Sequence, residues 1–323
     1  MTGVAIKDIR TQSVEERAAA AVLDVQLRQI SPGAFEGRTQ TAEFDDVMVY
    51  RDRWNRLTTS RGALPGGHVL FAAPVATGST LDWCGSRVGS HRLAVGLPEK
   101  QIDFIMTADT LYVAMVLPTS YLKTTFGDSA VDKLLKSGIQ QKQVGPDLGR
   151  RFLNRIDRAI SAASIKPESF TKDAGKAIEA DFLDDLAELG IFLDDQAPVH
   201  QAALRDILRR ACNAAELLRE RITVPQFAAQ IDVGQRNLEL AFKKHLGITP
   251  RRYLNSVRMQ QAYRELRSRS AASHCVTEVI GYWGFNEFGR FAGEYHKLFG
   301  ELPSETLQLP PLRPDNRLLD LRK

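Results

Sequence analysis

The chain has 323 residues, of which 43% are hydrophobic and 25% are charged, and its formal net charge is +4. This length is typical of about two domains. Three cysteines without a CxxC pair argue against a structural zinc site or a disulfide framework, and indicate a reducing compartment. The sequence has no run of about 18 apolar residues, and residues 1–17 lack the apolar centre of a signal peptide. We therefore expect a cytoplasmic protein that does not enter a membrane.

The charge differs between the two parts of the chain. Residues 200–323 hold 20 Lys and Arg against 13 Asp and Glu, a net +7, whereas residues 1–199 hold 23 against 26, a net −3. A basic segment suits contact with phosphates through counterion release. The alternative is that these Lys and Arg side chains only solvate helix faces.

The first part of the chain reads as β-structure. Residues 4–28 are typical of an opening strand followed by a short helix. Short strand-like runs separated by Gly, Pro, Ser and Asp then follow between Gly33 and Pro118. These runs are residues 47–51, 68–73, 92–97, 101–106 and 111–117. Many short strands at this spacing predict a small antiparallel barrel or jelly roll.

Residues 120–218 show apolar positions at helical spacing. The periodicity predicts helices over 147–163, 174–189 and 199–218, separated by breaks at Pro167 and Pro198. The last of the three is expected to connect the two parts of the chain.

An internal repeat follows near the C-terminus. Leu238, Phe242, Gly247 and Pro250 recur 53 residues later as Phe291, Tyr295, Gly300 and Pro303. In each copy a short helix (224–229; 276–282) precedes a turn and a second helix (235–245; 287–298) with a polar outer face. This arrangement is that of the helix-turn-helix, whose second helix enters the major groove of B-DNA. A repeat with matched spacing and stop signals is a stronger indication than one copy.

The repeat region resembles the AraC/XylS family of bacterial transcription regulators over residues 205–308. The similar segments are 224–229, 236–244, 247–254, 276–285 and 299–303. The resemblance implies a sequence-specific, DNA-binding regulator, an activator that contacts RNA polymerase and acts as a homodimer. It also implies that the N-terminal region is a cupin-like sensor barrel. The expected fold class is α+β, with a β-barrel over 1–125, a helical linker and dimerisation region over 126–200, a double helix-turn-helix over 201–308 and a tail over 309–323.

Some positions depart from the family pattern. Gly234 stands where the family has a capping Ser, which costs the first recognition helix a side-chain acceptor. Ile280 and Gly281 replace a small Ala and its neighbour, and Gly289 lies inside the second recognition helix, where Gly costs about 1 kcal/mol relative to Ala. We call each helix-turn-helix unit a reader. The second reader is therefore expected to bind DNA more weakly than the first.

The helix pattern assigns roles to individual side chains. We expect base contacts from the first turns of the two recognition helices, because Arg, Asn and Gln pair with guanine and adenine edges. These side chains are Gln235, Arg236, Asn237 and Glu239 in the first reader, and Asn286, Glu287 and Arg290 in the second. Phosphate contacts are expected from Lys243, Lys244, Arg251, Arg252 and Lys297, and the repeat positions Leu238, Phe242, Phe291 and Tyr295 should form the core.

The sequence carries little that indicates an enzyme. The first 199 residues contain two histidines, His68 and His91, with no HxH pair and no nearby Glu at a ligand-like spacing, so no metal or other cofactor is expected. GxSxG, phosphate-binding P-loop and dinucleotide-binding patterns are absent from the sequence. The alternative of a ligand-binding or enzymatic barrel with a partner-binding helical half predicts turnover or ligand affinity without salt-sensitive DNA affinity.

Two places could hold an effector. One is an apolar pocket inside the barrel. The other is the tail pair Arg313 and Arg317, because two guanidinium groups can grip phosphates. This pair resembles the Arg-x-x-x-Arg element with which PilZ domains hold cyclic di-GMP; the nearest partner stretch, Cys84–Gly89, has Cys where an acid or amide belongs. A solvated tail without ligand is the alternative. The pairs Arg151/Arg155 and Arg205/Arg209 fall on predicted helices, where this spacing is typical of a solvated face.

Overall fold

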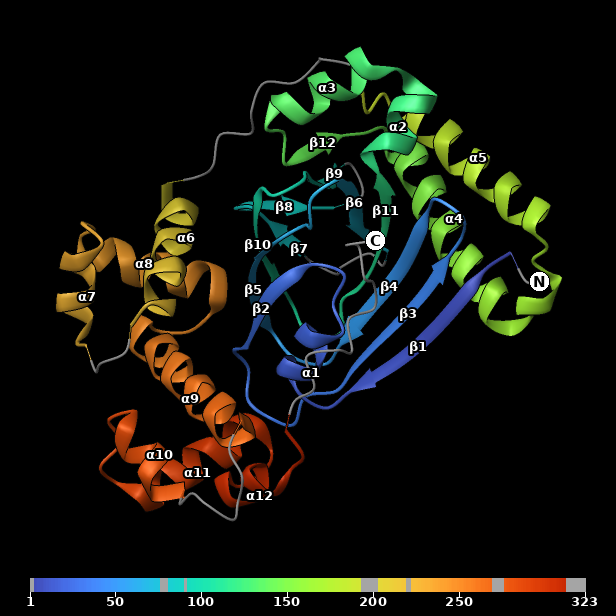
Figure 1. Cartoon of the computed structure of the whole chain (residues 1–323). Helices are drawn as coiled ribbons and strands as arrows, with labels where there is room; N and C mark the ends of the chain where they lie inside the picture. Colours follow the sequence, from blue (N-terminus) through green and yellow to red (C-terminus); the bar gives the residue numbers. More distant parts are fainter. Residues whose placement is uncertain are drawn as a thin grey trace.

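The computed structural model describes residues 3–75, 81–89, 92–192, 203–218, 222–268 and 276–311. The chain has the predicted α+β class, with antiparallel sheets in the first part and helices in the second (Figure 1). The strands are β1 (Ala5–Thr11), β2 (Asp24–Gln29), β3 (Gly37–Glu43), β4 (Met48–Trp54), β5 (Thr58–Ala63), β6 (His68–Pro74), β7 (Leu81–Trp83), β8 (Ser86–Val88), β9 (Arg92–Gly96), β10 (Gln101–Met106), β11 (Leu111–Pro118) and β12 (Gln141–Gln143).

One short helix lies between β1 and β2, and the other helices follow the last long strand, β11. They are α1 (Val14–Ala19), α2 (Thr119–Phe126), α3 (Asp128–Ser137), α4 (Pro146–Ile165), the short η1 (Pro167–Ser169), α5 (Lys172–Glu188), α6 (Ala203–Glu216), α7 (Val224–Gln230), α8 (Gln235–Leu246), α9 (Pro250–Ser268), α10 (Val276–Tyr282), α11 (Phe288–Phe299) and α12 (Pro303–Gln308). Within the described ranges, none of these helices is long and apolar enough to span a membrane.

The strands form two open sheets. The larger sheet has the order β1-β3-β4-β11-β6-β9-β12, and the smaller has the order β2-β5-β10-β7-β8. All ladders between these strands are antiparallel, as predicted. The prediction of a closed cupin-like barrel is wrong in this respect, because no ladder between described residues joins the edge strands of either sheet. Closure requires such a ladder, and hydrophobic alternation along single strands does not specify it.

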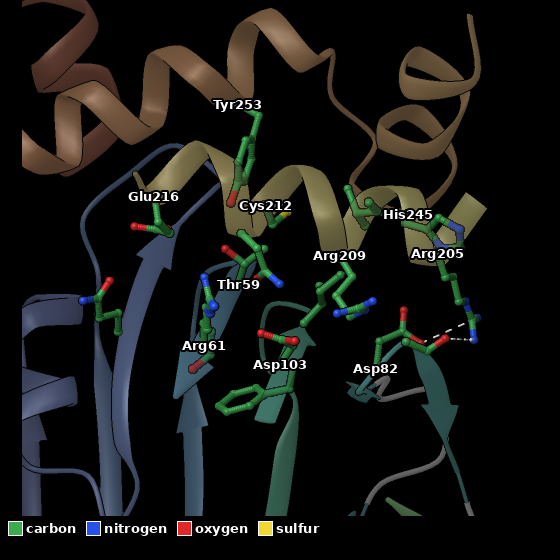
Figure 2. A pocket seen from close by; sticks show the side chains of 17 residues that line it. Thr59, Arg61, Asp82, Asp103, Arg205, Arg209, Cys212, Glu216, His245 and Tyr253 are labelled. Carbon is green, nitrogen blue, oxygen red and sulfur yellow. Dashed lines mark hydrogen bonds and ion pairs between the residues drawn. The ribbon is translucent and has the colours of Figure 1, made fainter. Parts of the chain in front are cut away.

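The helical part packs against the smaller sheet through α6 (Figure 2). Arg28 on β2 donates from Nε to Glu216 on α6 at 3.1 Å, and both side chains are largely buried. Arg264 on α9 donates to the backbone oxygen of Leu27 at 3.1 Å. Farther along, Gln29 donates from Nε2 to the backbone oxygen of Leu298, near the end of α11, at 2.5 Å. Ile105 of β10 packs against the core of the first copy, so the sheet touches both halves of the repeat region.

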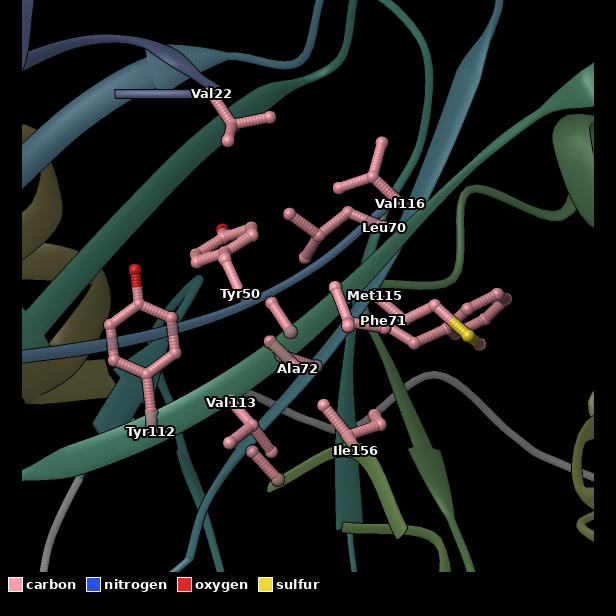
Figure 3. Packing of buried hydrophobic residues seen from close by; sticks show 14 of the residues in the cluster. Val22, Tyr50, Leu70, Phe71, Ala72, Tyr112, Val113, Met115, Val116 and Ile156 are labelled. Atoms are coloured by element: carbon pink, nitrogen blue, oxygen red, sulfur yellow. The ribbon is translucent and has the colours of Figure 1, made fainter. Parts of the chain in front are cut away.

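The core of the N-terminal part lies around the central strands β4, β6 and β11. Figure 3 shows Tyr50, Phe71 and Val113 packed among aliphatic neighbours, with Ile156 of α4 beside them. Residues 112–117 of β11 are buried without interruption, because α4 covers one face of the larger sheet and the second sheet lies on the other side (Figure 1). This cluster continues through α4 and α5 to Ile191, and β12 adds a strand from residues 141–143 to the larger sheet.

Candidate nucleic-acid interface

The two copies of the repeat have the same construction. Leu238 and Phe242 on α8 are fully buried, and so are their counterparts Phe291 and Tyr295 on α11. These four side chains form the predicted cores. Each second helix ends at a glycine in the left-handed region, with φ of 66° at Gly247 and 82° at Gly300, and a proline then begins the next helix.

The 19-residue helix α9 joins the two copies. Tyr253 and Val257 in its first half pack into the core of the first copy, whereas Tyr263 and Leu266 in its second half pack into the core of the second. The two helix-turn-helix units therefore lie at opposite ends of one helix (Figure 1). Because both halves of α9 are buried in a core, the separation of the two readers is fixed by its length.

The first recognition helix presents its polar side chains outward. Gln235, Arg236, Asn237 and Glu239 are all exposed at the beginning of α8. Gln235 donates from Nε2 to Glu239 at 2.8 Å, so these two side chains occupy neighbouring turns of one face. Gly234 is the residue before the helix and provides no side-chain hydrogen bond, as its sequence position predicted. The helix N-terminus is thus open toward a partner that accepts hydrogen bonds.

Basic side chains follow on the same helix and on the next. Lys243 and Lys244 are exposed in the last turn of α8, and Arg251 and Arg252 are exposed in the first turn of α9. Four cations at adjacent helix ends produce a locally positive surface, which suits phosphate contacts.

The second recognition helix is arranged differently. Asn286, Glu287, Arg290 and Lys297 are exposed at α11. However, Arg290 donates from Nε to Glu294 at 3.0 Å and lies 3.8 Å from Glu287. A base contact by Arg290 would therefore require it to leave these carboxylates. Gly289 has open space around it, so its cost is one of helix propensity and not of packing.

A groove of about 830 Å³ connects the two readers along α9. Arg258 of α9 stacks over the ring of Phe285 at 4.5 Å and donates to Asn255 at 3.0 Å. Asn255 in turn donates to Glu294 of α11 at 3.0 Å. Asn255 and Arg258 were not predicted from the sequence. The unusually polar sequence of α9 indicates exposed positions on this helix, but only the structure shows which side of the helix faces the groove.

Three large apolar side chains also lie on the outer surface of the readers. Leu240 and Phe288 are each 45% exposed, and Tyr282 is 65% exposed. Apolar side chains of this kind can contact the thymine methyl group in the major groove. The pattern of polar residues in the sequence did not predict these three side chains.

The remaining candidate residues lie elsewhere. His68 is hydrogen-bonded through Nδ1 to the backbone oxygen of Gly66 at 3.2 Å. Among the described residues, no group of three or more His, Cys, Asp or Glu side chains is arranged to hold a metal ion. His91 and the tail pair Arg313 and Arg317 lie outside the described residues.

Known proteins are similar to this chain over the same C-terminal region. Residues 227–308 match the family profile of a helix-turn-helix domain. A probable thc operon regulatory protein of Rhodococcus erythropolis is 43% identical over 112 residues, which are 34% of each chain. A XylDLEGF operon transcriptional activator of Pseudomonas putida is 36% identical over 93 residues, or 29% of each chain. The chain thus spans about a third of the length of the relatives it matches.

Solved structures give a related result. The structure of a probable AraC family transcriptional regulator from Rhodopseudomonas palustris is 32% identical, covering 32% of this chain and 94% of that one, with a TM-score of 0.29. The AraC-like transcriptional activator CuxR is 12% identical, covering 80% of this chain and 96% of that one, with a TM-score of 0.43. Superpositions this poor do not establish a common fold over the whole chain. The matched sequence and the repeated geometry agree on the C-terminal region: residues 227–308 are a helix-turn-helix domain.

Proposed function

We propose that this protein is a sequence-specific DNA-binding transcription regulator. One observation carries the proposal: the repeat positions predicted as core are buried, whereas all twelve side chains predicted to meet DNA are exposed on α8, α9, α11 and the turn before α11. Two such units joined by one helix suit successive major-groove segments about one helical turn apart.

Base reading is assigned to the exposed polar side chains of the two recognition helices. In the first reader these are Gln235, Arg236, Asn237 and Glu239, and in the second they are Asn286, Glu287 and Arg290. Phosphate contacts are assigned to Lys243, Lys244, Arg251, Arg252 and Lys297. Arg290 is paired with carboxylates, whereas Arg236 has no carboxylate partner among the described residues, so the first reader should supply more of the discrimination between sequences.

The features of the whole protein are proposals. The activator role follows the Pseudomonas putida relative. We also propose that the protein is a cytoplasmic homodimer that contacts RNA polymerase. Its domain boundaries are proposed at residues 125, 200 and 308. A cyclic di-GMP effector at Arg313 and Arg317 also stays a prediction. Calorimetric titration of the intact protein with cyclic di-GMP tests this prediction, and the absence of binding heat would refute it.

A mobility-shift assay on genomic fragments tests the proposed function. We expect the full-length protein to retard a small set of fragments, with affinity falling steeply as salt increases. A ligand-binding or enzymatic protein whose helices only bind partners would show turnover or ligand affinity, and no salt-sensitive retardation of DNA.

A further inference from the structure

A small pocket lies between the smaller sheet and the helical part (Figure 2). Its volume is about 60 Å³, enough for a compact molecule in place of a few waters. One side of the pocket is the face of β5 and β10 that carries Arg61 and Asp103, which lie opposite each other in the ladder. Along β10, Asp103 alternates with the buried Ile102 and Phe104, which point to the other face. The roof is α6, backed by His245 of α8 and Tyr253 of α9. The walls of this interdomain pocket thus come from both parts of the chain.

Hydrogen-bond donors converge on the pocket from two sides. In Figure 2 the carboxylate of Asp103 lies between the side chains of Arg61 and Arg209. Arg61 donates to Gln101 at 3.0 Å, and Arg209 donates to Asp206 at 2.7 Å. A guanidinium group has five donor hydrogens, so both arginines keep donors for a ligand.

Acceptors also face the pocket. Glu216 accepts from Arg28 through Oε1, but its Oε2 is buried and has no hydrogen-bond partner among the described residues. His245 Nε2 is likewise buried without a described partner. Asp103 accepts from Gln101, and no ion pair with either arginine is found for it in the described part of the chain. An unpaired buried polar atom costs free energy, which a hydrogen-bonding ligand would recover.

The charges around the pocket select the type of ligand. Three pairs neutralise each other: Arg28 with Glu216, Arg205 with Asp82, and Arg209 with Asp206. Arg61 and Asp103 remain, one charge of each sign. A lone anion would meet the carboxylates, and a lone cation would meet the guanidinium groups, whereas a molecule with both charges satisfies both sets.

The geometry points to a binding site for a small zwitterion of amino-acid size in this interdomain pocket. Its carboxylate would accept from Arg61 and Arg209, and its ammonium group would donate to Asp103 and to the free oxygen of Glu216. Ile105, on the same face of β10 as Asp103, and Leu208 of α6 supply apolar atoms to the pocket lining.

Such a ligand would also link the two parts of the chain. Because Arg61 and Asp103 belong to the sheet and Arg209 and Glu216 to α6, occupation stabilises the docked arrangement over any other. If the protein regulates transcription as proposed above, the zwitterion is the signal that holds both readers against the sheet; this consequence rests on the proposed function, whereas the site does not.

Calorimetric titration of the full-length protein with the common amino acids, without DNA, tests the site. At least one amino acid should bind. Acetate and methylamine, which each carry only one of the two charges of an amino acid, should bind at least about 10-fold more weakly. Arg209→Gln and Asp103→Asn should each weaken binding by about 10-fold or more. Arg150→Gln, on the exposed side of α4, is the matched control and should not change it.

Several results would overturn the assignment. These are no heat from any amino acid, acetate or methylamine binding as tightly as the zwitterion, or both variants binding like Arg150→Gln. A circular dichroism melt of each variant establishes that it is folded before titration, and the two variants alter different parts of the chain. Measuring DNA affinity separately distinguishes failure of the site from failure of the regulatory role.

Discussion

Arg236→Ala separates sequence reading from general DNA affinity. Arg236 is exposed in the first turn of α8, and within the described ranges it forms no hydrogen bond or ion pair. Its removal should therefore change the free energy of unfolding by no more than about 0.5 kcal/mol. If it binds a guanine edge through two hydrogen bonds, the loss at the preferred sequence is about 1–3 kcal/mol. That corresponds to roughly 5- to 150-fold in Kd.

The assay is fluorescence anisotropy with two duplexes of equal length, one selected from retarded genomic fragments and one of scrambled sequence. The variant should lose most of its preference for the selected duplex and keep nearly all its affinity for the scrambled one. Arg150→Ala, which removes an exposed arginine from α4, controls for the change in net charge. Equal losses on the two duplexes would show that Arg236 does not read bases.

Other substitutions probe the phosphate contacts, the second core and the interdomain pocket. Lys244→Ala should weaken binding to both duplexes alike and lower the salt slope by about 1; a loss confined to the selected duplex would contradict this role. Phe291 is buried, with ring centroids 4.5 Å from Phe285 and 5.4 Å from Tyr295. Phe291→Ala should cost about 3–5 kcal/mol in urea unfolding, and a cost below about 1 kcal/mol would refute its place in the core. Burial, reinforced by Arg205, lowers the pKa of His245. The unfolded chain therefore binds more protons near the ordinary pKa of about 6.5, and stability falls as pH decreases through this range. In urea unfolding at several pH values, His245→Gln should reduce this loss of stability. An unchanged pH dependence of stability would contradict the role of His245.

The sequence predicted the repeat region closely. The second helix of the first copy was expected over 235–245 and covers Gln235–Leu246, while α10 has the expected bounds. Helices are specified by neighbours along the chain, and glycine followed by proline ends them locally. The outward placement of the predicted DNA-contact side chains follows from the same periodicity.

Sheet pairing was less predictable. β5, with the sequence Thr-Thr-Ser-Arg-Gly-Ala, lacks apolar alternation, yet it pairs with both β2 and β10. Gly62 shows one cause, because a Cβ there would lie 2.0 Å from the backbone oxygen of Asp24. The strand is held by close backbone approach to its neighbours, which a local hydrophobic pattern does not reveal. β12 was likewise missed because its pairing with β9 joins distant segments.

The interdomain pocket was not predictable at all. Arg205 and Arg209 have the spacing of a solvated helix face, and a sequence contains no sign that a sheet covers them. In the structure Arg205 lies 3.6 Å from Asp82, and Arg209 lines the pocket. Long-range packing between the two parts of the chain changes the surroundings of these residues, although their helix was expected.

Hydroxyl-radical footprinting of the full-length protein on its preferred fragment tests most directly whether the two readers bind DNA together. We predict two protected segments on one face of the duplex, about 10 base pairs apart, with both lost as salt is raised. A single protected segment, or uniform weak protection on every fragment, would contradict the paired docking of α8 and α11.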